Sequence, residues 1–280
     1  MGDLDLVTKI LMCAAPEAFV RLWLGREVEV HEVRAADKEL QSRRVLMDKL
    51  YELRLAGEAG HRWLHVEVAA VWEHDLPYRM FDYWGMARRT VSGPIGSLLI
   101  CLKPGSRQGR PTNTYREADA GTELAFRYLL VRAWSWTVGE LLQGNPALLP
   151  FVPYAGDANV AKVDDAIRTA DQVEPRSLRA DLLAALAVFA QNVFKDVDWS
   201  ARMPRELLME SAIYRQGEAA GERKLVKVLL ETKLGDEAPR LATRLESCTE
   251  EQLEAMARLL VTELSREALV AALERLIAGS

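Results

Sequence analysis

The chain contains 280 residues, of which 49% are hydrophobic and 28% charged, a composition that is typical of a soluble globular protein and excludes a disordered chain. Its length allows one main domain with an appendage. No apolar run approaches the roughly 18–20 residues that cross a bilayer. Asp3 and Asp5 precede the first apolar stretch, which is the wrong flank for a signal peptide, so we expect a cytoplasmic protein with no membrane partner.

The first predicted elements are two short helices within residues 4–24, divided near Pro16, because proline is accepted in a first helical turn. Two strands are predicted next, at 45–55 and 63–71. The glycines of the segment between them, 56–61, suit a hairpin turn.

Alternation along this hairpin predicts one polar face and one apolar face. A turn centred near residues 58 and 59 places Asp48 opposite Ala69 and Leu50 opposite Glu67. The polar face then holds Asp48, Glu52, His65, Glu67 and Ala69, and the apolar face holds Met47, Tyr51, Leu53, Leu55, Leu64, Val66 and Val68.

In that register Asp48 and Glu67 are diagonal neighbours whose backbones lie about 7–8 Å apart. Two carboxylates at this separation can hold one Mg²⁺ or Mn²⁺ ion between them. Spacing alone favours an amphipathic hairpin that exposes its acids to solvent. His65 on the same face is either a ligand or base of the site or, as we favour, an exposed strand histidine.

The next predicted element is a helix over 74–89, with Asp75 as N-cap, Pro77 in its first turn, and Arg79 and Tyr83 on one face. Residues 95–102 form a continuous apolar run and are predicted to be a buried central strand. A basic loop follows, and 124–136 is an apolar stretch that is either strand or helix.

Charge is distributed unevenly along the chain. The formal net charge of −5 argues against strong nonspecific binding of nucleic acid, because such affinity comes from neutralising phosphates. Residues 79–110 nevertheless hold six basic residues against one acid, Asp82. This basic segment directly follows the acidic pair in sequence.

From about Asp164 the pattern is helical to the end of the chain. Thr249 to Gln252 has the sequence of a capping box that opens one of the last helices, and Ser265 is expected to cap the final one. The polar helix around 205–234 contains Gly217 and Gly221, whose spacing suits either a homodimer contact or, as we favour, a solvated linker helix.

The order of these elements and residues resembles the recombination-promoting nuclease family, a transposase-like group of the PD-(D/E)XK nuclease superfamily. In that family a strand with an Asp precedes a strand with Glu-x-Gln and a helix with an Arg and a Tyr four apart, and Asp48, Glu67, Arg79 and Tyr83 match these positions. Leu149-Pro150 and the run 213–218 resemble its distal region, and 222–276 resembles a helical domain often found at its C-terminus. The resemblance covers nearly the whole chain through short motifs.

The resemblance implies a PD-(D/E)XK-like α/β domain at 1–200, with a small mixed sheet flanked by helices, then a linker helix at 201–235 and an all-helical module at 236–280. It also implies DNA endonuclease activity, in which Asp48, Glu67 and the Val68 carbonyl hold Mg²⁺ or Mn²⁺. Glu17 is a weaker match to the superfamily's helical catalytic acid. Arg79, Tyr83, Arg88 and Arg89 would contact DNA, and arginines there position phosphates without reading sequence.

One departure bears on activity. The superfamily has Lys, and this family often Gln, where the present chain has Ala69. A lysine there orients the attacking water and stabilises charge on the phosphate, and alanine does neither. Glu52 lies on the face of Asp48 and is a substitute by parity, whereas Lys49 points the other way. The alternative to an endonuclease is therefore a catalytically inactive nuclease fold that binds nucleic acid or protein.

The sequence gives little support for other chemistries. The three cysteines, Cys13, Cys101 and Cys248, are far apart and provide neither a disulfide framework nor a C-x-x-C metal site. The four histidines lack H-E-x-x-H spacing, and there is no Walker loop and no nucleophile elbow.

Overall fold

The computed structural model describes residues 3–25, 30–35, 41–42, 45–46, 49–56, 60–105, 110–119, 121–234, 238–245, 248–260 and 266–278. The chain divides into two compact units, Met1–Ile213 and Tyr214–Ser280. Among the described residues, no helix combines the length and the apolar character that a membrane span requires.

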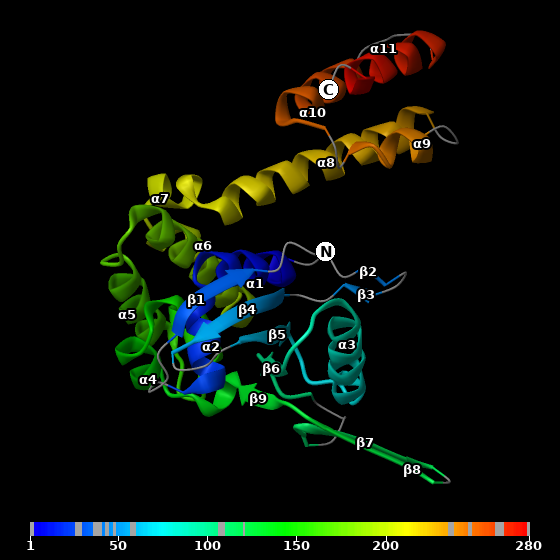
Figure 1. The fold of residues 1–280 in the computed structure, drawn as a ribbon. Helices are drawn as coiled ribbons and strands as arrows, with labels where there is room; N and C mark the ends of the chain where they lie inside the picture. The colour runs from blue at the N-terminus through cyan, green and yellow to red at the C-terminus, as the bar shows by residue number, and fades with distance from the viewer. Residues whose placement is uncertain are drawn as a thin grey trace. The chain divides into compact units, whose positions relative to one another are not determined.

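The first unit is built on a five-stranded mixed sheet with the strand order β1-β4-β5-β6-β9 (Figure 1). Neighbouring strands are antiparallel from β1 to β5 and parallel from β5 to β9. The strands are β1 (Val30–Ala35), β4 (Lys49–Leu55), β5 (His61–Ala69), β6 (Ile95–Cys101) and β9 (Leu129–Arg132). Two further strands, β2 (Gln41–Ser42) and β3 (Val45–Leu46), form a separate short ladder.

Helices cover one face of the sheet and bury the large core of this unit. Tyr51, Leu64, Val66 and Leu98 point into this core, and the Tyr51 hydroxyl donates a hydrogen bond to the Met12 carbonyl at 2.6 Å. Gly96 on β6 permits the close approach of a helix, because a Cβ there would lie 2.0 Å from the Trp23 ring. The elements on this side include α1 (Asp3–Ala14), α2 (Pro16–Leu24), α6 (Arg176–Val193) and the 3₁₀ segment η2 (Pro146–Tyr154).

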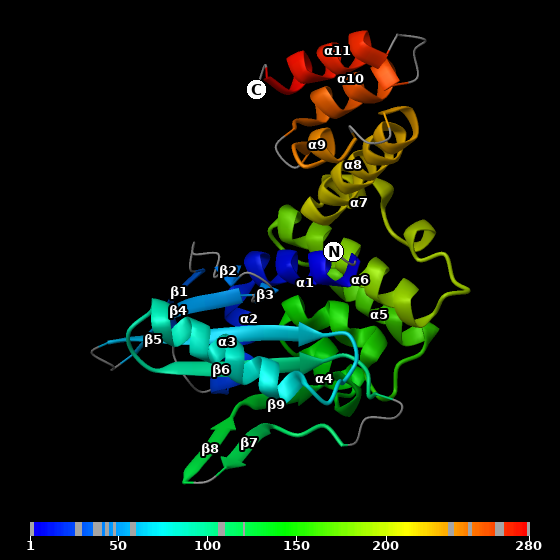
Figure 2. The ribbon, with the colours of Figure 1, turned by 90° about the vertical axis from the view of Figure 1, so that its right-hand side faces the viewer.

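The helix α3 (Leu76–Thr90) lies against the opposite face of β5 and β6 (Figure 2). Its buried residues Leu76, Met80, Tyr83 and Ala87 recur at helical spacing and define the side that packs on the sheet. Asp75 is the N-cap residue and Pro77 lies in the first turn, as the sequence predicts, although the Asp75 side chain makes no capping hydrogen bond.

A two-stranded antiparallel hairpin projects from this side of the domain (Figures 1 and 2). It consists of β7 (Thr114–Asp119) and β8 (Thr122–Arg127), which we call the arm. The stretch 124–136, left open between strand and helix, therefore belongs to β8, β9 and the short 3₁₀ turn η1 (Ala133–Ser135).

The hairpin of β4 and β5 keeps the predicted alternation but differs in register by two residues. Leu50 lies opposite His65, not opposite Glu67. A shift of two residues preserves the faces, so the apolar set still enters the large core. The polar face is not solvated beside β6, however, because α3 covers it, and His65 and Glu67 are 0% and 5% exposed. The interpretation of these two residues as exposed side chains is therefore wrong.

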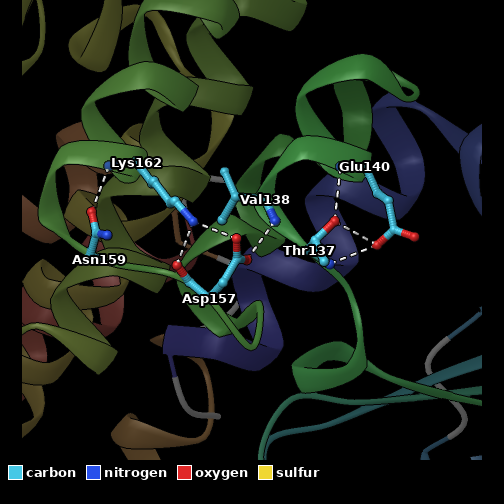
Figure 3. A network of polar contacts seen from close by, with 6 residues as sticks. All are labelled: Thr137, Val138, Glu140, Asp157, Asn159 and Lys162. Atoms are coloured by element: carbon cyan, nitrogen blue, oxygen red, sulfur yellow. Dashed lines mark hydrogen bonds and ion pairs between the residues drawn. The ribbon is translucent and has the colours of Figure 1, made fainter.

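The remaining elements of the first unit are helical, and a polar network holds two of them together. The Asp157 carboxylate accepts hydrogen bonds from the Val138 backbone N–H, at 2.8 Å, and from the Lys162 ammonium (Figure 3). Thr137 and Glu140 form a capping box at the adjacent helix start. The elements are α4 (Val138–Gln143), α5 (Val160–Ala170), η3 (Ser200–Arg202) and α7 (Arg205–Glu210).

The second unit is all-helical and has its own core. Thr249 and Gln252 form the predicted capping box, with reciprocal hydrogen bonds of 2.8 and 3.3 Å. Its helices are α8 (Ala212–Leu234), α9 (Ala238–Ala242), α10 (Glu250–Leu260) and α11 (Arg266–Ala278). Ser265, the predicted cap of α11, lies outside the described residues.

The predicted linker helix at 201–235 differs from the observed arrangement. The described part of this range contains the end of η3 and two α-helices, α7 and α8, which are separated at Ser211. α8 buries Val226, Leu230 and Leu234 in the core of the second unit, and from Tyr214 onward it belongs to that unit. The fold class is mixed α/β with C-terminal helices, which confirms the coarse prediction.

We predict that Asp157 stabilises the first unit in a pH-dependent way. Lys162 first and the Val138 N–H second lower the pKa of this carboxyl below its usual 3.8. Its contribution is therefore complete above pH 3.8 and is lost as the pH falls through the lower folded-state pKa. Urea unfolding should show a constant difference between wild type and Asp157→Asn at higher pH that shrinks below this value. A difference that does not vary with pH would contradict this assignment.

We also predict that Leu230→Ala destabilises the second unit by about 2–5 kcal/mol, because Leu230 is fully buried in its core. Hydrogen exchange measured by mass spectrometry should accelerate in α10 and α11 and stay unchanged in the first unit. Leu225→Ala is the matched control on the same helix, since Leu225 is 55% exposed. Equal effects of the two substitutions would rule out the described core.

Candidate functional site

The candidate site centres on Glu67, in the second half of β5, at the interface between the sheet and α3. Parallel pairing places three residues of β5, His65, Glu67 and Ala69, beside three residues of β6, Ser97, Leu99 and Cys101. The six side chains share the face that α3 covers, because paired residues in neighbouring strands point to the same side. Glu67 is thus a carboxylate in a largely apolar interface.

Arg79 on α3 provides the positive charge that accompanies this carboxylate. Its guanidinium lies 3.5 Å from the Glu67 carboxylate and 3.5 Å from that of Glu73, which is more exposed. Burial lowers the pKa of Arg79, but a hydrogen bond with Tyr83 and the charge of Glu67 outweigh this effect, so that the net shift is upward. Arg79 is therefore a permanent cation shared between two carboxylates.

Tyr83 lies one turn after Arg79 on α3 and covers His65. Its ring meets the His65 ring edge to face, with 5.5 Å between centroids and 90° between planes. His65 Nε2 in turn lies 3.7 Å from a Glu67 oxygen. The structure therefore brings together Glu67, Arg79 and Tyr83, with His65 as a buried neighbour.

Ser97 is a site residue that the sequence does not single out. It lies beside His65 in the β5–β6 register and is 4% exposed. Its Oγ is buried and has no hydrogen-bond partner among the described residues. A buried hydroxyl without a hydrogen-bond partner costs free energy. Such unpaired groups occur where a site binds a further polar group. The only sequence signal is its position as the one polar side chain in the run Ile95 to Leu102.

The surroundings of Ala69 are apolar. Ala69 packs with Leu99, Cys101 and Trp72 in a small core beneath α3. Burial raises the pKa of the Cys101 thiol to about 11, so it stays protonated at neutral pH. The described cluster around Ala69 is hydrophobic where the superfamily has Lys. Glu52, considered as a substitute, pairs instead with His61, at 2.9 Å.

The predicted metal ligands are only partly covered by the described residues. Asp48 lies outside them. Glu67 is in place, and the side chain of Val68 packs against the large core on the other face. Within the described ranges, no cluster of three His, Cys, Asp or Glu residues suits a metal ion. One carboxylate is an incomplete set for Mg²⁺, so the metal site stays a prediction that depends on Asp48.

The other predicted site residues lie elsewhere. Glu17 is exposed on α2 and lines a cavity of about 550 Å³ with residues of α4 and η2, which does not include Glu67. Arg88 and Arg89 are exposed in the last turn of α3. They lie nine and ten residues beyond Arg79, or about 14 Å along the helix. A contact of these arginines with the same phosphate as Arg79 is therefore not expected.

Comparisons of the chain with protein-family models, with curated proteins and with solved structures gave no match.

We predict a measurable coupling between Glu67 and Arg79. A double-mutant cycle with Glu67→Gln and Arg79→Met should give about 1 kcal/mol in urea unfolding, reduced from the value of a fully buried pair because the Arg79 side chain is 36% exposed. The control cycle replaces Arg79→Met with Arg89→Met, which is exposed on the same helix and should give a coupling near zero. Equal couplings in the two cycles would exclude a specific pair.

Proposed function

We propose that this protein is a metal-dependent DNA endonuclease of the PD-(D/E)XK type, related to the recombination-promoting nucleases. The observation that carries this proposal is the buried Glu67 carboxylate on β5, in contact with Arg79 from a helix that also contributes Tyr83. A carboxylate beneath an Arg and a Tyr four residues apart is the arrangement that the sequence resemblance implies. The order of β4, β5 and α3 along the chain, with β4 and β5 paired in the sheet, supports the same assignment.

In the proposed site Glu67, together with Asp48 and the Val68 carbonyl, would hold Mg²⁺. A bound Mg²⁺ supplies activation of water and stabilisation of the leaving oxygen. Glu67 is well suited to hold a cation, because its charge is sheltered from solvent and attracts positive charge more strongly than an exposed carboxylate does. DNA is the proposed partner.

Arg79 has a defined part in this proposal because it contacts two carboxylates. A cation that takes Glu67 competes with Arg79, and Glu73 remains as a partner for the guanidinium. Arg79 can therefore turn toward a phosphate while the Glu73 carboxylate still compensates part of its charge. Arginine suits this role, since its planar group donates two parallel hydrogen bonds to phosphate oxygens.

A second candidate is a noncatalytic nuclease fold that binds nucleic acid or protein. The apolar packing of Ala69 with Leu99 and Cys101 favours it, because hydrophobic side chains surround the position where the superfamily has Lys. Under this alternative Glu67 and Arg79 are a structural pair that anchors α3.

We predict that the purified protein nicks supercoiled plasmid DNA in Mg²⁺ or Mn²⁺ and that Glu67→Gln abolishes the nicking. The substitution keeps the shape of the side chain and removes the charge that would hold the metal. Glu206→Gln is the control, since Glu206 is an exposed glutamate of α7 outside the candidate site, and it should retain activity.

Equal nicking by wild type and Glu67→Gln would mean contamination or a wrongly placed site. Absence of nicking in all three proteins would overturn the endonuclease and favour the noncatalytic candidate. Circular dichroism of each variant establishes that the substitutions leave the fold intact.

A further inference from the structure

A continuous group of aromatic rings joins α3 to the arm. Phe81 stacks on Tyr115, with 5.4 Å between ring centroids and 21° between planes, and Tyr78 meets Tyr115 at 5.6 Å. Trp84 and Phe126 extend the group at 5.6 Å from one another. We call these five residues, Tyr78, Phe81, Trp84, Tyr115 and Phe126, the aromatic platform.

The platform is not enclosed by the protein. Tyr78 is 52% exposed, and the other four residues are partly exposed. A large apolar ring that remains this exposed beside other rings can stack on a further flat, unsaturated group. The bases of a nucleic-acid strand are such groups, and every base has a face that can stack.

The charge of the segment that carries most of the platform favours an anionic partner. Residues 79–132 hold nine arginines and lysines against four acids, in a chain whose net charge is −5. Arg79 directly follows Tyr78 on α3, and Arg116 and Arg127 are exposed on the arm. A strand lying across the base of the arm would therefore meet rings together with positive charges, as single-stranded nucleic acid requires.

The acids of this segment are concentrated toward the end of the arm. Glu117, Asp119 and Glu123 are exposed there, and Glu117 accepts a hydrogen bond from the Tyr115 hydroxyl at 2.7 Å. Their charge repels phosphates from the tip. This distribution limits the contact to the base of the arm and argues against insertion of the whole arm into a DNA groove.

We propose that the aromatic platform binds single-stranded DNA by stacking of unpaired bases, with Tyr78 as its most accessible ring. This inference rests on the proposed function, because it names the strand contact of that site. Tyr78 and Arg79 are adjacent, with Cα atoms about 3.8 Å apart, and Arg79 contacts Glu67. A base on Tyr78 thus holds the backbone of its own strand close to the proposed hydrolytic site.

The test measures binding and not cleavage, so that it is independent of the nuclease proposal. Fluorescence anisotropy of a labelled single-stranded oligodeoxynucleotide is recorded with the full chain in EDTA and compared with the duplex of the same sequence. We expect the single strand to bind more tightly and Tyr78→Ala to weaken it about tenfold. Tyr214→Ala is the matched control, because Tyr214 is an exposed tyrosine of the second unit, and it should leave the affinity unchanged.

The salt dependence of binding tests the charged part of the surface. Arg116→Gln and Arg127→Gln should each lower the slope of the logarithm of affinity against the logarithm of salt concentration by about 0.7, the value for one phosphate contact of a single strand. Tyr78→Ala should lower the affinity without changing this slope. The arginine variants thus report the electrostatic contribution to binding, and the tyrosine variant reports the contribution of stacking.

Several results would overturn the inference. The inference fails if the protein binds the single strand and the duplex with equal affinity, or if it does not bind DNA. It also fails if Tyr78→Ala and Tyr214→Ala lower the affinity for the single strand equally. A lower molecular mass of Tyr78→Ala in light scattering would also overturn it, since the platform would then be a contact between two copies. Binding of the single strand with the expected pattern, but no nicking of plasmid, supports the platform and rejects the nuclease proposal. Nicking without such binding supports the nuclease proposal and rejects the platform.

Discussion

The burial of one carboxylate, Glu67, between the sheet and α3 is the constraint on which this side of the molecule depends. A carboxylate removed from water costs several kcal/mol unless a partner compensates its charge. Arg79 is the cation beside it, at 3.5 Å, and it reaches Glu67 only when α3 lies across β5 and β6. The apolar residues of α3 fix the helix on the sheet, and Tyr83 covers His65 in the same position. Packing and charge compensation therefore require one and the same placement of α3.

This placement also determines what lies around the site. The opposite face of the sheet is filled by the large core, so the domain does not need the α3 side for most of its apolar burial. The α3 side can accordingly keep a buried acid, partly exposed rings and a buried serine hydroxyl that has no hydrogen-bond partner in the described part of the chain. These features weaken a purely structural interface. Their occurrence on one side of the sheet is the physical reason to regard this interface as a functional site. The apolar surroundings of Ala69 set the limit of the analogy with nucleases that use a lysine there.

The alternation of polar and apolar residues predicts the faces of β4 and β5. The capping residues predict the start of α3 and the capping box of α10. They do not predict the register of β4 and β5, because a shift of two residues leaves every side chain on its face. They also do not predict that α3 covers the polar face, since that depends on the parallel addition of β6. β1 is short and carries three charged or His residues among six, and the arm is polar on much of its surface, so neither shows a strong pattern. Of the predicted site, Glu67, Arg79 and Tyr83 lie together, Glu17 lies at another cavity, and Asp48 is outside the described residues.

The measurement that most directly tests whether Glu67 is a functional carboxylate is thermal unfolding with and without Mn²⁺, for wild type and Glu67→Gln. A ligand that binds only the folded state raises the unfolding temperature, by an amount that grows with its concentration relative to its dissociation constant. We predict a rise that depends on Mn²⁺ concentration in wild type and is absent in Glu67→Gln. The same rise in both proteins, or no rise in wild type, would contradict the account and leave Glu67 and Arg79 as a structural pair.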